Sequence, residues 1–200
     1  MKCMFFYNLF VILKMKSYLE YSEKILKKYS NPKRFEFLKK YSECPEKIVL
    51  LGCGGGHNAF SLAKLYEDAK VYGIDKSKDM LRVARKNKSI IGSSVRFYEG
   101  SFLDFVISKP DIVCFINSLH FSRNIKLTLR FVSEKLNRNG IIFIDEPTEK
   151  STFGAKLTKL QLQKKHQQLK KSRNEILRYL SDKKYQNIST SDRFRIIIML

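Results

Sequence analysis

Short apolar runs alternate with amphipathic stretches through the middle of this chain. The runs have the length of strands, and the stretches between them place apolar residues at helical spacing. In chain order the expected elements are a strand at 48–51, a helix at 57–68, a strand at 70–74, a helix at 79–88, strands at 95–98 and 111–116, a helix at 124–136 and a strand after residue 140. Strands that alternate with helices predict a doubly wound α/β sheet covered by helices on both faces.

The two ends of the chain carry different patterns. Residues 15–42 predict two helices broken at Asn31-Pro32, which would form a helical cap on the sheet. Residues 155–184 predict an amphipathic helix, with a break near Ser172 left open. Residues 185–190 and 194–200 predict two strands joined by a polar turn. We therefore expect an N-terminal helical extension at 1–44 and one main domain at 45–200.

The first residues allow several interpretations. The segment 3–13 is apolar apart from one asparagine and has lysines on both sides. It is too short for a membrane-spanning helix, which needs about 20 residues. It fits the core of a signal peptide, extra upstream sequence with Met15 as the true start, or a helix packed over the site. We favour the last two, since no small-residue cleavage site follows.

The composition adds a strong positive charge. The net charge is +20, with 39 Lys and Arg against 19 Asp and Glu, and ten of the basic residues lie in 155–184. Such a charge favours nucleic acid or an acidic membrane surface as a partner. The alternative is a compositional bias towards lysine with solvated helix faces, which we favour because the charge is spread along the chain.

Four cysteines show neither a C-x-x-C pair nor zinc spacing, so no metal site is predicted. Cys53 and Cys114 fit small buried apolar groups, and this cysteine usage suits a reducing compartment such as the cytoplasm.

The main candidate for chemistry is the glycine-rich turn at 52–56, between the first strand and the first helix of the domain. Glycines permit positive φ and let a ligand approach the backbone, and the helix start offers unpaired N–H groups. Asp75 ends the next strand, 19 residues after Gly56. A carboxylate there can accept hydrogen bonds from both hydroxyls of a ribose. The alternative for Asp75 is a helix cap, a role that Ser77 could also fill.

The glycine spacing separates two nucleotide-binding classes. The dinucleotide fingerprint requires a small residue at the sixth position, where this chain has His57, and its own spacing is G-x-G-x-G. At this point the chain resembles the class I S-adenosylmethionine-dependent methyltransferases. The resemblance continues in order through 95–102, 111–120 and 136–144, and covers about residues 46–146.

The resemblance implies a seven-stranded, mostly parallel sheet with an antiparallel last strand, and S-adenosyl-L-methionine as the cofactor. The candidate cofactor-binding residues are Gly52, Cys53, Gly54, Gly56, Asp75, Lys76, Ser101, Phe102 and Asn117. Methyl transfer mainly requires proximity and alignment, so a catalytic residue need not be evident. His120, in the loop after the fourth strand, is the candidate base, and a histidine that only hydrogen-bonds within the loop is the alternative.

Two positions depart from the family pattern, because Leu50 and Ser101 stand where acids are frequent. We expect a methyltransferase that acts on a small molecule, without a membrane partner and with its oligomeric state open. An RNA-modifying methyltransferase that uses the basic helices and a non-catalytic protein with a cofactor-type fold remain alternatives. A nucleotide-dependent oxidoreductase is disfavoured by His57.

Overall fold

The computed structural model describes residues 31–148 and 159–200 of the chain. The apolar segment 3–13, the first helix predicted within 15–42 and the predicted start of the C-terminal helix at 155–158 lie outside the described residues. The predicted division of the chain between residues 44 and 45 stays a prediction.

Seven strands form one sheet in the order β3-β2-β1-β4-β5-β7-β6. The strands are β1 (Lys47–Leu51), β2 (Lys70–Asp75), β3 (Arg96–Glu99), β4 (Ile112–Ile116), β5 (Ile141–Pro147), β6 (Tyr185–Asn187) and β7 (Arg193–Met199). The first five strands are mutually parallel, and β7 runs antiparallel to both β5 and β6. The predicted mostly parallel sheet with an antiparallel last strand is confirmed. The carboxyl ends of β1–β5 and the amino end of β7 share one edge.

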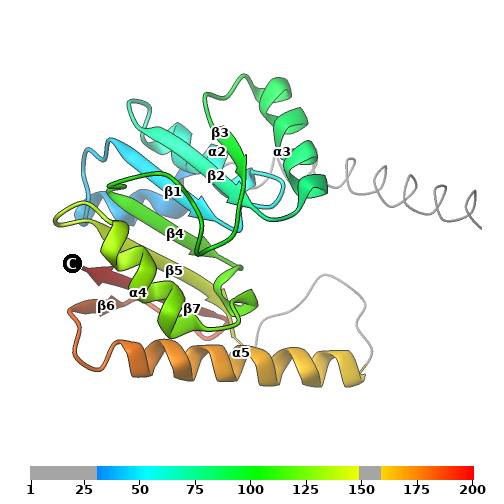
Figure 1. The fold of residues 1–200 in the computed structure, drawn as a ribbon, viewed down its shortest axis with the longest axis vertical. Helices are drawn as coiled ribbons and strands as arrows, with labels where there is room; N and C mark the ends of the chain where they lie inside the picture. Colours follow the sequence, from blue (N-terminus) through cyan, green and yellow to red (C-terminus); the bar gives the residue numbers. More distant parts are fainter. Residues whose placement is uncertain (1–30, 149–158) are drawn as a thin grey trace, which may run out of the picture.

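Helices cover both faces of this sheet (Figure 1). They are η1 (Pro32–Lys40), α2 (His57–Leu65), α3 (Lys78–Ile91), η2 (Leu119–Phe121), α4 (Ile125–Lys135) and α5 (Lys159–Tyr179). One core cluster joins the sheet to η1, α2 and α3 through residues such as Phe35, Phe60 and Leu81. The other joins it to α4 and α5 through residues such as Leu129 and Ile176. The sheet is therefore buried on both faces, as its apolar strands predicted.

Local sequence signals explain where several helices begin. The side chain of Asn31 accepts a hydrogen bond from Lys33 N at 3.1 Å, and Pro32 occupies the first turn of η1. Asn124 caps α4 in the same way, through Leu127 N at 2.9 Å. Capping of this kind satisfies N–H groups that a helix start leaves unpaired. The predicted cap at Asn31 is confirmed, but η1 is a 3-10 helix.

Three helices differ from the prediction. α3 continues to Ile91, three residues beyond the predicted end at 88. α2 ends at Leu65, because the buried Tyr66 leaves helical geometry and its hydroxyl donates to the Ser42 carbonyl oxygen at 3.1 Å. α5 continues through Ser172 without a break. Leu169, Ser172 and Ile176 are all buried. They follow one another at intervals of three and four residues, so Ser172 belongs to the helix face that packs on the protein.

No helix within residues 31–148 and 159–200 is both long enough and apolar enough to cross a membrane.

Candidate active site

The glycine turn connects β1 to α2 at the carboxyl edge of the sheet. Gly52, Gly54 and Gly56 have φ values of 71°, 52° and 88°. A Cβ on Gly52 would lie 2.5 Å from the Cβ of Ser118, so packing alone excludes a side chain there. A Cβ on Gly54 would have only Met80 Cε within 4 Å, at 3.2 Å. Gly54 therefore borders space that a ligand can enter.

Polar groups at the start of α2 remain available. Gly56 is the cap position of α2 and supplies no side-chain hydrogen bond. Nδ1 of His57 is buried and has no hydrogen-bond partner within the described residues, and burial lowers the pKa of this imidazole. An unsatisfied buried nitrogen and uncapped N–H groups are what a polar ligand would complete.

Asp75 joins the second strand to the glycine turn. Its Oδ2 accepts a hydrogen bond from Gly54 N at 2.8 Å, and its Oδ1 accepts one from Ser77 N at 2.9 Å. The cap of α3 is Ser77, whose hydroxyl accepts from Met80 N at 3.3 Å, so the cap alternative for Asp75 is wrong. A carboxylate has about four acceptor sites, so the half-buried Asp75 can still accept two hydroxyl groups. Lys76 beside it is exposed.

The loop after β3 contains an acid that the sequence analysis missed. Ser101 is exposed, and its hydroxyl accepts a hydrogen bond from Leu103 N at 3.3 Å. The carboxylate of Asp104 accepts from Ser101 N. Phe102 packs edge-to-face on Phe115, with ring centroids 5.4 Å apart. The negative charge absent at Ser101 is thus present one turn later, and the S-x-x-D spacing was the available signal.

His120 pairs with Glu146 beside the carboxyl end of β4. Both side chains are buried, and Nδ1 of His120 contacts Oε2 of Glu146. Oε1 of Glu146 accepts from Ser118 N and Leu119 N, at 2.8 and 2.7 Å. A carboxylate oxygen accepts hydrogen bonds, so Nδ1 of His120 is the donor in this contact, and the neutral tautomer with this donor has its lone pair on Nε2. Nε2 has no hydrogen-bond partner within the described residues.

Three arginines surround one buried carboxylate on the opposite face of β5. Asp145 is 1% exposed. Its Oδ2 accepts from Arg34 Nη2 at 2.8 Å, and its Oδ1 accepts from Arg193 Nε at 2.6 Å and Arg195 Nε at 3.3 Å. Arg193 Nη1 also donates to Asn117 Oδ1 at 2.7 Å, and Asn117 has a positive φ of 55°. We call Asp145, Arg34, Arg193 and Arg195 the arginine cluster. The sequence analysis did not identify it.

The buried cysteines have packing roles. Cys114 in β4 is fully buried, and Cys53 in the glycine turn is 6% exposed. Burial, reinforced by the nearby Asp145 and Asp75 carboxylates respectively, raises the pKa of both thiols well above the ordinary value. Neither sulfur is therefore a thiolate nucleophile near neutral pH. Within the described residues, no group of three or more His, Cys, Asp and Glu side chains could hold a metal ion.

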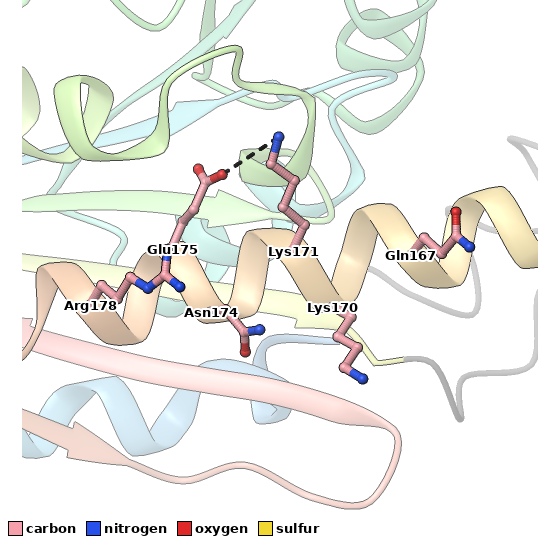
Figure 2. Close-up of a pocket in the computed structure, with 6 residues that line it drawn as sticks. All are labelled: Gln167, Lys170, Lys171, Asn174, Glu175 and Arg178. Carbon is pink, nitrogen blue, oxygen red and sulfur yellow. Dashed lines mark ion pairs between the residues drawn. The ribbon is translucent and has the colours of Figure 1, made fainter.

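A surface hollow lies away from this edge, along α5. Figure 2 shows its lining residues, Gln167, Lys170, Lys171, Asn174, Glu175 and Arg178, all on that one helix. Lys171 Nζ lies 3.9 Å from Glu175 Oε1. None of the predicted site residues lines the hollow, and it belongs to the basic face of α5.

If this basic face is a solvated surface, replacing Lys164, Lys165, Lys170 and Lys171 together by alanine should change solubility and little else. If the face follows a phosphate backbone, RNA affinity should fall with salt with a log–log slope of about −0.7 per contacted phosphate on single strands. We expect a solvated surface, so fluorescence-anisotropy titrations against bulk tRNA at low and moderate salt should show little difference between the two proteins. Micromolar binding that survives moderate salt in the wild type and is lost in the variant would contradict it.

Comparison with known proteins places the glycine turn, Asp75 and Asp145 within one matched region. A family model described as "Methyltransferase domain" matches residues 46–191. A carboxy-S-adenosyl-L-methionine synthase of Campylobacter jejuni is 30% identical over 98 residues, which are 48% of this chain and 42% of that protein. The same enzyme of Nautilia profundicola is 26% identical over 115 residues, 56% of this chain and 49% of that protein. The chain thus spans less than half the length of these relatives.

Solved structures share the fold over nearly the whole chain. The plantazolicin methyltransferase BpumL, in complex with S-adenosylhomocysteine (SAH), superposes with a TM-score of 0.68 at 14% identity. The match covers 93% of this chain and 88% of that one. A SAM-dependent methyltransferase from Aquifex aeolicus gives a TM-score of 0.65 at 16% identity, covering 88% and 97%. At sequence identities of 14% and 16%, this structural similarity shows a shared fold.

Proposed function

Because the chain belongs to the methyltransferase domain family, we propose that it is an S-adenosyl-L-methionine-dependent methyltransferase that acts on a small molecule. The observation that carries this proposal is the hydrogen bond between Gly54 N and Asp75 Oδ2, at 2.8 Å. It holds the glycine turn against the acid at the end of β2. A ligand with a ribose and a charged amino-acid end needs both groups side by side.

The residues at this edge fit the cofactor. The space beside Gly54, the uncapped start of α2 and the free acceptor sites of Asp75 match a backbone cradle followed by a ribose site. We assign the methionine end to the backbone of Gly52, Cys53, Gly54 and Gly56, and the ribose to Asp75 with Lys76 beside it. Ser101 and Phe102 would border the adenine, with the Asp104 carboxylate next to Ser101, and Asn117 would face the reacting end.

In the proposed reaction the bound cofactor supplies a methyl group that is already activated on a sulfonium. The protein then has to align the acceptor and exclude water. For a hydroxyl acceptor it must also remove a proton, and Nε2 of His120 is the base that we assign to this step. Glu146 positions His120 because it accepts from Nδ1 and is itself fixed by two backbone N–H groups.

Substituting His120 by glutamine is therefore expected to lower the methyl-transfer rate by about 10²- to 10⁴-fold while SAH affinity stays unchanged. Glu146→Gln should lower the rate as well, since an amide cannot hold the imidazole in the same tautomer as reliably as a carboxylate. Steady-state rates with an identified acceptor, together with SAH titrations of both variants, measure this. A His120→Gln enzyme with the wild-type rate would leave only the loop-structure role for this residue.

The cofactor assignment is tested by calorimetric titration with SAH, S-adenosyl-L-methionine and NAD(H). We expect SAH and S-adenosyl-L-methionine to bind and NAD(H) not to bind. Incubation with S-adenosyl-L-methionine and pools of small molecules, followed by mass spectrometry, then tests the reaction. A methylated product together with SAH supports methyl transfer, whereas accumulation of carboxy-S-adenosyl-L-methionine would favour the reaction in the names of the Campylobacter and Nautilia relatives. Failure to bind any of these compounds would support the non-catalytic alternative.

We further propose the cytoplasm as the site of action. Cys44, Cys53 and Cys114 are free thiols, which is compatible with a reducing compartment.

A further inference from the structure

The arginine cluster carries more positive charge than its own carboxylate balances. Three guanidinium groups pair with the carboxylate of Asp145, which gives these four residues a net charge of +2. The exposed carboxylate of Asp192 also lies near Arg193 and Arg195, which help to lower its pKa, and counting it still leaves a net charge of +1. Asp145 is nearly completely buried, and the arginine side chains are 16–29% exposed. Glu146, the next acid along β5, is engaged by His120 on the other face of the sheet. Partly buried like charges are unfavourable unless an anion or water compensates them.

The three arginines differ in how far their donors are used. Arg193 uses all three of its side-chain nitrogens, since Nε, Nη1 and Nη2 donate to Asp145 Oδ1, Asn117 Oδ1 and the Asp145 carbonyl oxygen. Arg34 uses Nη1 and Nη2 on Asn58 and Asp145. Arg195 uses only Nε, at 3.3 Å from Asp145 Oδ1. Within residues 31–148 and 159–200, neither Nη1 nor Nη2 of Arg195 has a partner. Asp145 therefore holds Arg195 in place while its terminal N–H groups stay available.

The position of the cluster connects it to the candidate active site. Asp145 lies near the carboxyl end of β5, and Arg193 and Arg195 lie near the amino end of β7, so all three are at the sheet edge that carries the glycine turn. Arg193 contacts Asn117, and Arg34 contacts Asn58 in the first turn of α2. All three arginines lie outside the residues 46–191 that the family model matches, so the match says nothing about their role. A planar guanidinium with free N–H groups suits carboxylate and phosphate oxygens.

We propose that Arg195, supported by Arg34 and Arg193, binds an anionic oxygen group of the methyl acceptor, so that the substrate is a small molecule with a carboxylate or a phosphate. That the bound anion belongs to a methyl acceptor rests on the proposed methyltransferase function, but anion binding by the cluster does not depend on that function. Arg193 and Asp145 form the fixed part of this site, and Arg195 is its contact residue.

The test uses benzoate and inorganic phosphate as probes, titrated at low ionic strength into the free and the SAH-saturated protein. We expect one of the two anions to bind with one site per chain, which also tells a carboxylate acceptor from a phosphate acceptor. Arg195→Gln should weaken this binding at least tenfold, and Arg195→Lys, which keeps the charge but loses the planar fork, should weaken it less. Asp145 keeps two arginine partners in both variants, so we expect them to fold.

Arg138→Gln is the matched control, because Arg138 is exposed in the turn before β5, at the opposite edge of the sheet. It removes the same charge and should leave anion binding unchanged. The proposal is overturned if neither anion binds the wild-type protein, or if Arg195→Gln and Arg138→Gln weaken binding equally.

One further arm identifies the source of the anionic group. SAH carries the methionine carboxylate, whereas methylthioadenosine lacks the amino-acid part. If Arg195→Gln weakens SAH binding but not methylthioadenosine binding, the guanidinium serves the cofactor and the acceptor assignment is wrong. Unchanged SAH affinity with weakened anion affinity supports it. If SAH itself does not bind the wild type, the proposed function fails, and the probe titrations on the free protein still decide whether Arg195 binds anions.

Discussion

Gly54→Val is expected to abolish SAH binding. Gly54 has φ of 52°, and a side chain there would enter the space that the turn leaves open next to Met80. The branched Cβ would displace a ligand that approaches the backbone of the turn. Forcing a β-branched residue to positive φ also costs about 1–2 kcal/mol, so the thermal midpoint should fall by about 2–8 °C. Calorimetric titration and thermal unfolding measure the two effects separately.

Gly92→Val provides the matched control for the strain. Gly92 ends α3 with φ of 63°, and a Cβ at this position meets nothing within 4 Å. This variant therefore has the same unfavourable backbone geometry in open space. It should lose similar stability and keep wild-type SAH affinity. If Gly54→Val binds SAH as well as Gly92→Val does, the glycine turn is only a structural connection.

Asp75→Ala is expected to weaken SAH binding by about 1.5–3 kcal/mol, or roughly 10- to 150-fold. The carboxylate would lose its hydrogen bonds to the ribose hydroxyls, and Gly54 N would lose its acceptor at 2.8 Å. Asp75→Asn keeps the size of the side chain but loses the charge, and its NH₂ group can donate only. The SAH affinity of Asp75→Asn, measured by calorimetric titration, should therefore lie between those of the wild type and the alanine variant.

The control for Asp75 is Asp79→Ala. Asp79 lies in the first turn of α3, is exposed, and pairs with Arg82 of the same helix at 3.2 Å. Its removal changes the net charge equally but should leave SAH affinity unchanged. Equal SAH affinity in wild type and Asp75→Ala would exclude Asp75 as the ribose-binding residue.

Two neighbouring acids near the carboxyl end of β5 hold the basic residues to which our proposals assign two different tasks. Asp145 and Glu146 are neighbours in a strand, so their side chains point to opposite faces. Glu146 holds His120 on the face of α4 and α5, and Asp145 holds the arginines on the face of η1 and α2. In our proposals His120, held by Glu146, removes a proton from the acceptor, and the arginine cluster binds an anionic group. The two proposals can fail independently, since their variants and readouts differ.

The sequence by itself determined most of the elements and the sheet edge at which the candidate site lies. Periodicity predicted β1 to β5, the glycine spacing predicted the turn, and the spacing to Asp75 predicted the acid beside it. These features are local, because an apolar run or a G-x-G-x-G turn specifies its own backbone. The cap at Asn31 was predicted for the same reason. The exact helix ends were harder to predict, since α2 stops where Tyr66 is buried by tertiary packing.

Only the tertiary structure decided which polar residues meet. Arg34 and Asp145 are 111 positions apart in sequence, and Asp145 and Arg193 are 48 apart. Arg193 meets Asp145 because β7 inserts antiparallel between β5 and β6, which places its first residues at the carboxyl end of β5. Arg34 meets Asp145 because η1 packs on the Asp145 face of the sheet, where Phe35 lies against Phe143. The pairing of His120 with Glu146 depends equally on β4 lying beside β5. No local pattern contains the strand order or the register, so a lone histidine or arginine in the sequence does not reveal its partner.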